Sequence, residues 1–276
     1  MIGLDAKVVP RGRIVLYGVD SVFPVVPVLI ILAAWALAAW FINVSVGVYF
    51  PGPWDTFALL FQLMGGRPLF RSTLYAHLFA SLGRFLLGLV SATVVGVSAG
   101  LVMGYSKSVR EHLYPVVSIL QPIPSVTWIP VAIMLFGIGN LSTVLIIFMA
   151  AIWPTVVNTV AGAESVPDNY KRMAGMFRLR RSGVFARIVV PHSVPYILNG
   201  LRISVANAWR ALVAAEMIAA TGTGLGYVII QSRWNLDYTS AFACIVVIAV
   251  IGYVMERIVF RRLEYVTLKR WGMLAA

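Results

Sequence analysis

Charged residues are scarce in this chain, at 12% of 276 residues, whereas 60% of the residues are hydrophobic. That balance is too apolar for a soluble globular domain, so soluble classes are excluded. Acidic residues are scarcer still, with 10 Asp and Glu against 22 Lys and Arg. Since no paired carboxylates and no nucleophile–base arrangement occur, we expect no catalytic residues and not an enzyme.

Cysteine, histidine and nucleotide-binding motifs are also nearly lacking. The single Cys244 excludes an intrachain disulfide. His77, His112 and His192 show no metal-ligand spacing, so no metal site is expected. The glycine-rich segment Thr221–Gly226 lacks the lysine of a phosphate-binding loop, so this chain does not bind ATP by that route.

Long apolar runs are what the chain has in abundance. Six runs, each of roughly 20 residues, predict an all-α membrane protein with six transmembrane helices. They cover approximately Val22–Val44, Leu82–Gly104, Leu113–Gly137, Thr143–Gly162, Ile197–Ala220 and Ser240–Phe260. The first run lacks a small-residue cleavage site, so we interpret it as a retained helix rather than a signal peptide.

The basic residues predict the orientation of these helices. With the N-terminus inside, sixteen of the 22 Lys and Arg fall in cytoplasmic segments, because basic residues gather on that side of a membrane. Four fall outside and two within a span: Arg67, Arg71, Arg84 and Arg233 outside, Arg202 and Arg210 within. Both termini are therefore expected to be cytoplasmic. Anionic lipid explains the positive charge without a nucleic-acid partner.

The chain is expected to form one membrane domain. Its predicted parts are 1–50 (cytoplasmic N-terminus and first helix), 51–80 (periplasmic segment), 81–262 (five-helix core with the cytoplasmic loop 163–195) and 263–276 (cytoplasmic tail). Apolar residues at helical spacing between Trp54 and Met64 indicate a short interfacial helix.

Small residues every fourth position, from Gly88 to Gly104, favour close helix packing within the subunit over a dimer or moving interface.

Prolines and polar residues inside the spans indicate a translocation pathway. Pro122 and Pro124 must break the third span, and irregular backbone at this depth needs a protein partner or a water-filled cavity. A purely structural kink is the alternative. The candidate pathway residues are Gln121, Pro122, Pro124, Ser125, Asn207, Arg210 and Glu216. Arg210 either has a structural partner or attracts an anion, and Glu216 is otherwise wet or bonded to a loop near the outer interface.

The segment from Glu164 to Pro195 holds six Lys or Arg residues between two spans. Its pattern predicts two short helices broken near Arg181-Ser182-Gly183. Such a loop is typical of a compact docking surface on the cytoplasmic side, which a soluble partner would bind.

The motifs in this loop and elsewhere resemble a known family. Around Ala174 and Ile188-Val189-Val190-Pro191, the loop resembles the cytoplasmic signature of permeases of bacterial ATP-binding-cassette (ABC) importers, with Arg178 where that signature has glycine. Further motifs match the nitrate/sulfonate/taurine branch of binding-protein-dependent inner-membrane components. They are Ser81-Leu82-Gly83-Arg84, Gln121-Pro122-Ile123-Pro124, Trp128-Ile129-Pro130, Leu135–Gly139, Gly200-Leu201-Arg202, Ala215-Glu216 and Gly224-Leu225-Gly226.

The resemblance implies a type I importer (MetI-like) fold in the bacterial inner membrane. The expected partners are a second permease copy, two cytoplasmic ATPase subunits, which hold ATP and Mg, a periplasmic substrate-binding protein and the bilayer. This chain itself would carry no cofactor. A coupling helix from about Val166 to Phe177 would enter the ATPase, with Ser165 as N-cap, Pro167 in the first turn and Gly183 taking over the turn. Its contact residues would be Val166, Pro167, Asp168, Tyr170, Lys171, Arg172, Ala174, Gly175, Met176 and Arg178.

The substrate implied is a small anion, such as a sulfonate, taurine, nitrate, bicarbonate or a similar organic acid. One alternative is the same importer type for a neutral or cationic vitamin precursor. Another is a passive membrane channel or scaffold, which would need neither a compact basic loop nor a nucleotide-binding partner.

Overall fold

A computed structural model describes residues 25–260, without the side chains of Val25, Lys171 and 258–260. The basic residues before 25 and after 260, which entered the topology prediction, lie outside the described residues, as does the predicted tail 263–276. The chain forms two compact units, with the boundary in the sequence between Asp55 and Thr56. Each unit is described by itself.

The first unit contains helix α1 (Val25–Ser45). Nearly all of its described side chains are exposed, as expected of a helix that apolar lipid surrounds. The chain after α1 folds back along it. The Trp35 Nε1 donates to the Pro51 carbonyl at 3.0 Å, and the Asn43 amide exchanges hydrogen bonds with both backbone groups of Phe50.

Helix α2 (Pro53–Met64) confirms the short helix predicted from Trp54 to Met64. A two-stranded antiparallel turn follows, with β1 (Pro68–Leu69) paired to β2 (Ser72–Thr73). Helix α3 (Leu74–Tyr105) then begins where the Thr73 hydroxyl accepts from the Ala76 N–H at 3.3 Å. It starts eight residues before the predicted span.

The predicted third span is broken, as its prolines require. Helix α4 (Lys107–Leu120) ends before Pro122, and the 3₁₀ turn η1 (Ser125–Trp128) leads into α5 (Ile129–Phe136). The axis bends by 92° at the break. Pro124 lacks an N–H, so the chain cannot continue the α4 hydrogen-bond ladder through it.

The remaining helices complete the second unit. They are α6 (Asn140–Glu164), α7 (Asp168–Met176), α8 (Arg181–Val184), the π-helical η2 (Phe185–Val189), α9 (Val190–Ala219), α10 (Leu225–Trp234), α11 (Tyr238–Val254) and the π-helical η3 (Met255–Phe260). Helix α9 starts seven residues before the predicted span. Pro191 lies in its first turn, where a missing N–H leaves no hydrogen bond unmade.

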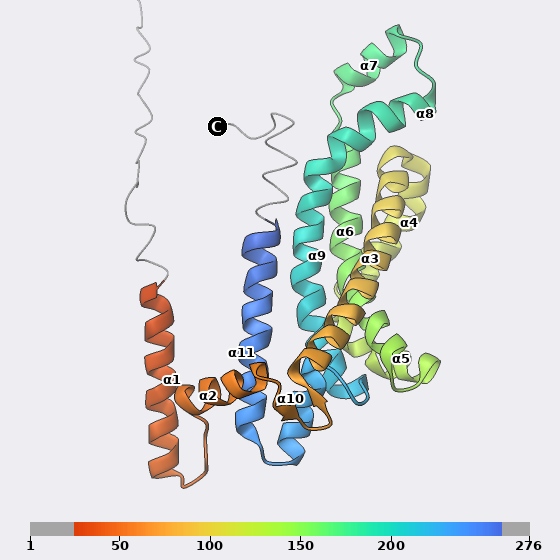
Figure 1. The fold of residues 1–276 in the computed structure, drawn as a ribbon. Helices are drawn as coiled ribbons and strands as arrows, with labels where there is room; N and C mark the ends of the chain where they lie inside the picture. The colour runs from red at the N-terminus through yellow and green to blue at the C-terminus, as the bar shows by residue number, and fades with distance from the viewer. Residues whose placement is uncertain (1–24, 261–276) are drawn as a thin grey trace, which may run out of the picture. The chain divides into compact units, whose positions relative to one another are not determined.

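Helices α3, α6 and α9 form the core, and Figure 1 shows α6 and α9 running side by side. The small-residue stripe of α3 faces α6, as the packing interpretation predicts. A Cβ on Gly100 would lie 2.5 Å from the Thr159 Cβ, and one on Gly88 would lie 2.6 Å from Ile147. The stripe therefore lets the two backbones approach more closely than alanine would permit.

Among residues 25–260, four helices are long and apolar enough to cross a membrane: α1, α3, α6 and α11 with the start of η3. The bent α4–α5 pair makes a fifth if it is one span. Helix α9, with 30 residues, is long enough to cross a membrane, but its sequence is too polar to count as a candidate span by composition. Six spans therefore remain a prediction.

Candidate functional site: a membrane cavity and an exposed helical loop

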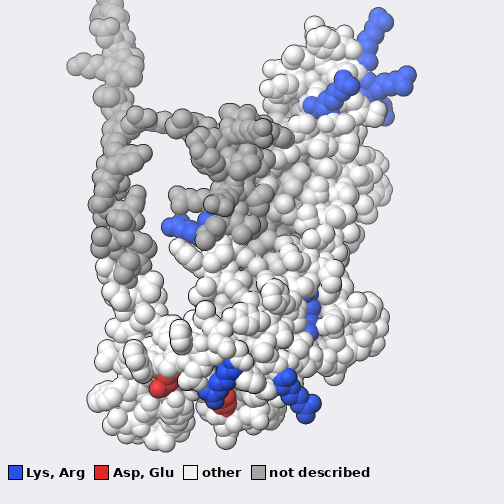
Figure 2. Space-filling view, viewed as in Figure 1, with Lys and Arg blue, Asp and Glu red and all other residues white. Residues whose placement is uncertain are grey.

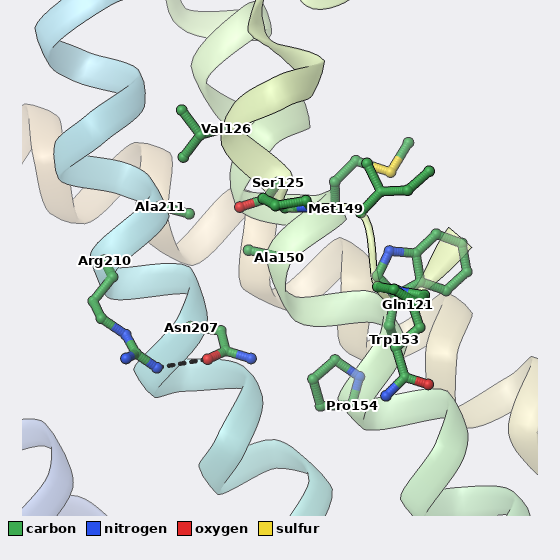
Figure 3. A pocket seen from close by; sticks show the side chains of 13 residues that line it. Gln121, Ser125, Val126, Met149, Ala150, Trp153, Pro154, Asn207, Arg210 and Ala211 are labelled. Carbon is green, nitrogen blue, oxygen red and sulfur yellow. Dashed lines mark hydrogen bonds between the residues drawn. The ribbon is translucent and has the colours of Figure 1, made fainter. Parts of the chain in front are cut away.

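The break between α4 and η1 opens onto a cavity of about 390 Å³. Six of the seven predicted pathway residues line it together: Gln121, Pro122, Pro124, Ser125, Asn207 and Arg210. Figure 3 shows the α9 side chains on one side of this cavity, with Gln121 and Trp153 on the other. Three segments that are distant in sequence thus meet at one cavity, which is lined by both polar and apolar side chains.

Helix α9 presents its polar side chains to the cavity one helical turn apart. The Arg210 Nη2 donates to the Asn207 Oδ1 at 2.7 Å, and the Arg210 Nε donates to the Ala206 carbonyl at 3.1 Å. These bonds hold the guanidinium in place and leave its Nη1 side available. Among the described residues that line the cavity, Arg210 is the only charged one. The cavity therefore favours negative charge.

The α6 wall of the cavity is a feature that the sequence prediction missed. Met149, Ala150, Trp153 and Pro154 line it, as the i, i+1, i+4 and i+5 positions of one helix face. This spacing indicates one face of a helix in the sequence, but it does not distinguish a face that lines a cavity from a face that packs in the core. The Trp153 Nε1 is buried without a hydrogen-bond partner among the described residues. A buried donor of this kind is uncommon in folded proteins.

Glu216, the seventh predicted pathway residue, is not among the lining residues of this cavity. It is fully buried and pairs with Arg84, whose Nη1 lies 2.7 Å from its Oε1. The Ser81 hydroxyl and the Gly226 N–H also reach its carboxylate, at 2.8 and 2.9 Å. Glu216 is thus bonded to α3 and to the first turn of α10, and it is buried rather than wet. Arg84, which was counted among the outside charges, is buried near the start of α3.

This buried polar cluster fixes the segment Thr221–Gly224. Arg84 also donates to the Thr223 carbonyl at 2.8 Å and to the Asn140 Oδ1 at 2.7 Å. The Gly224 N–H donates to the His77 Nδ1 at 3.1 Å, so His77 Nε2 carries the proton that the Leu69 carbonyl accepts at 3.1 Å. Gly224 has φ +135°, and a Cβ there would lie 2.7 Å from Arg84 and Glu216. Only glycine fits at this position.

The loop between α6 and α9 contains α7, the predicted coupling helix. Tyr170, Met173, Met176 and Phe177 are all exposed on it and share one face at helical spacing. Met173 and Phe177 were not among the predicted contact residues, although they share the i, i+3, i+7 spacing with Tyr170. Val166 and Ala174, which were predicted contacts, are buried against the chain itself. The side chain of Lys171 lies outside the described residues.

Basic side chains gather over this end of the molecule, as Figure 2 shows. The described cations of the loop are all exposed: Arg172, Arg178, Arg180, Arg181 and Arg187. Tyr105 donates from its hydroxyl to the Arg181 carbonyl at 3.0 Å and so ties the loop to the end of α3.

Two predictions about the loop geometry were wrong. Ser165 does not cap α7; it ends α6, and its hydroxyl bonds to the Gly162 carbonyl and His192, while Pro167 precedes α7 as its N-cap. The chain turns at Arg178, which has φ +49°, rather than at Gly183, which lies inside α8. Helix α7 is short and ends in a Schellman motif. The turn therefore lies at Arg178, three residues before the predicted break near Arg181.

The fold and cavity are those of a multi-pass membrane protein with a polar hollow between its helices. Residues 92–263 match the family model for the binding-protein-dependent transport system inner membrane component. The chain is 34% identical over 183 residues to the nitrate import permease protein of Synechocystis, over 66% of each chain. It is 34% identical over 227 residues to the taurine transport system permease protein of Escherichia coli, over 82% of each chain.

A probable ABC transporter permease protein of Brucella melitensis is also 34% identical, over 82% of this chain and 89% of the relative. This chain belongs to the family of binding-protein-dependent transport system inner membrane components. The comparison confirms the family that the motifs indicate, and with it a multi-pass inner-membrane permease.

Proposed function

We propose that the chain is the permease subunit of an ATP-driven importer for a small anion, delivered by a periplasmic binding protein. The observation that carries this proposal is the cavity, in which Arg210 is the only charge among the described lining residues. A fixed positive charge in a low-dielectric hollow attracts anions and repels cations. The relatives named for nitrate and taurine are consistent with such a solute.

In this proposal α9 is a sixth span and both termini are cytoplasmic. Tyr196, Asn199, Ile203 and Arg210 are exposed along α9 at spacings of three, four and seven residues. Lipid does not tolerate the polar members of this stripe, because an arginine at membrane depth costs roughly 2.5–3.5 kcal/mol. A second copy of the permease would cover the stripe and complete the pathway as a homodimer.

The α7 stripe would dock in a cytoplasmic ATPase subunit, of which two would be present to hydrolyse ATP with Mg. Its four exposed apolar side chains would be buried there, as the anchors of a helix in a groove. The basic residues around the stripe would face acidic ATPase residues or lipid phosphate. Closure of the ATPase pair would then move α7 and open the cavity toward the other side.

Replacing Arg210 with Gln tests the anion assignment. We expect uptake of nitrate or methanesulfonate to fall roughly 10- to 100-fold, because a hydrogen bond to a charged group contributes about 1.5–3 kcal/mol. ATP hydrolysis should persist. Arg233→Gln is the matched control, since Arg233 stacks on Trp234 away from the cavity. Unchanged anion uptake in Arg210→Gln would favour a neutral solute, and ATP-independent flux would favour a channel.

Replacing Met176 with Glu tests the docking assignment. Met176 is 82% exposed, so the substitution leaves the isolated fold intact and adds a charge to the stripe. An unpaired charge in an apolar contact should reduce recovery of the ATPase–permease complex tenfold or more. Ser182→Glu adds the same charge on α8 and should leave recovery unchanged. Equal recovery of both variants would contradict docking through α7.

A further inference from the structure

The cavity between the α4 break, α6 and α9 offers a solute more than the charge of Arg210. Its described lining residues include no Asp or Glu, and the polar ones besides Arg210 are Gln121, Ser125, Trp153 and Asn207. Each of these four side chains can donate a hydrogen bond, and Trp153 and Arg210 can only donate. The cavity is therefore rich in hydrogen-bond donors and lacks negative charge among the residues that the structure describes.

The Asn207 amide is oriented by its neighbour Arg210. A guanidinium group has no acceptor, so the Asn207 atom that lies 2.7 Å from the Arg210 Nη2 is the oxygen. The amino group of Asn207 is then turned away from Arg210, as Figure 3 shows, and it makes no hydrogen bond within residues 25–260. Arg210 thus occupies the Asn207 oxygen and leaves the two amide N–H groups for a solute.

The Trp153 indole supplies a further donor, on the opposite side of the cavity from Arg210 (Figure 3). Its ring lines the cavity, yet its Nε1 is buried and has no hydrogen-bond partner among the described residues. Such an N–H has lost its water and gained no bond in return, which is unfavourable. A rotation of the indole would bring this N–H to an acceptor in the cavity, and the unmade bond favours that rotation.

We propose that Asn207 and Trp153 are specificity-determining donors, and that the solute is an oxyanion without a cationic group, such as nitrate or an alkanesulfonate. This inference rests on the proposed anion-import function. Such a solute presents only acceptor oxygens, which match the donors of Arg210, Asn207 and Trp153 on two sides of the cavity. A zwitterion such as taurine adds an ammonium group, for which the described lining residues offer no carboxylate.

Binding to the purified ATPase–permease complex tests the Asn207 assignment, with methanesulfonate and taurine as the probes. The wild-type complex should bind methanesulfonate at least tenfold more tightly than taurine. Asn207→Asp keeps an oxygen for Arg210 but replaces the amino group with a second, negatively charged oxygen. It should weaken methanesulfonate binding tenfold or more and taurine binding less, because the new carboxylate accepts the taurine ammonium. Asn235→Asp makes the same change at an exposed amide outside the cavity and should leave both affinities unchanged.

Uptake of nitrate and methanesulfonate by the complete transporter in proteoliposomes tests the Trp153 assignment. Trp153→Phe keeps an aromatic ring and removes the N–H, so the maximal uptake rate should fall about tenfold. Trp128→Phe is the matched control. The Trp128 Nε1 is also buried without a partner among the described residues, but Trp128 does not line the cavity. Its uptake should stay near the wild-type rate, which separates donation to the solute from the packing effect that both substitutions share.

An unchanged ratio of methanesulfonate to taurine affinity in Asn207→Asp would overturn the inference, as would equal uptake by Trp153→Phe and Trp128→Phe. If Asn207→Asp does not assemble, the two tryptophan variants still decide the matter. A wild-type complex that takes up methanesulfonate but binds taurine equally well would refute this inference alone. Absence of anion uptake by the wild-type transporter would instead refute the proposed function.

Discussion

Arg178 ends α7 in a backbone conformation that glycine adopts more easily than any other residue. The Leu179 N–H donates to the Ala174 carbonyl and the Arg178 N–H to the Gly175 carbonyl, both at 3.0 Å, which is a Schellman motif with Arg178 at the left-handed position. A side chain at positive φ costs roughly 1–2 kcal/mol, so the ending of α7 is strained by its own residue.

Replacing Arg178 with Gly should therefore stabilise the loop, by about 0.5–1 kcal/mol after the larger backbone entropy of glycine is subtracted. Hydrogen exchange at the Leu179 amide is the measurement, and it should slow two- to fivefold. Gly183→Ala is the comparison, since Gly183 already has helical geometry and room for a Cβ. Exchange at Leu179 that is equal or faster in Arg178→Gly would show that the turn is not strained.

The Arg84–Glu216 pair gives a second prediction at the scale of single residues. Replacing Glu216 with Gln leaves the Arg84 guanidinium buried without its counter-ion, which should destabilise the fold by roughly 3–5 kcal/mol. Thermal unfolding of the purified protein in detergent would show a lower midpoint. Glu111→Gln is the control, because Glu111 meets Lys107 at 3.7 Å with both side chains exposed. Similar midpoints for both variants would refute a structural role for the buried pair.

The contacts of single side chains were harder to predict from the sequence than the helices were. Arg84 and Glu216 are 132 residues apart, and neither the span pattern nor local spacing links them. Arg210 and Asn207, three residues apart on one helix, were grouped correctly because helical geometry alone places them together. Contacts between neighbours on one helix can be predicted from a single sequence, whereas contacts that depend on tertiary packing cannot.

At the scale of elements, the glycine stripe of α3 sets its distance from α6. Gly100→Ala should destabilise the core by roughly 1–3 kcal/mol, because the added Cβ would meet the Thr159 side chain and the Val156 carbonyl, which is backbone and cannot rotate away. Gly83→Ala, on the same helix but with nothing within 4 Å, should be neutral or slightly stabilising. Thermal unfolding in detergent distinguishes the two, and equal midpoints would contradict tight α3–α6 packing.

Most elements follow from the sequence because apolar length and proline position are local signals. The broken third span and the α2 helix needed no tertiary information. The start of α9 lies seven residues before the predicted span, because the apolar run marks only the membrane-length part of the helix, whereas its first turns hold Pro191 and Pro195. The end of α7 was predicted to within one residue. The turn after it was misplaced, because it uses Arg178 rather than Gly183.

At the scale of the whole molecule, the cavity is where separate predictions agree. The proline break, Asn207 and Arg210 were singled out independently, and the fold brings them to one hollow. The α6 wall was missed because Met149 and Trp153 read as ordinary core side chains until the packing around the break is known.

If α9 is the sixth span, as proposed above, its polarity also constrains how the chain is made. Arg202 and Arg210 each add about 2.5–3.5 kcal/mol to the insertion of this helix into lipid, so α9 is a poor candidate for entering the bilayer alone. Its stable insertion then requires the earlier helices α3 and α6, of which α3 offers Glu216 an ionic partner in Arg84. A nascent chain that stops short of α9 would keep Arg84 uncompensated inside the bilayer, a defect that membrane quality control would recognise in truncated products.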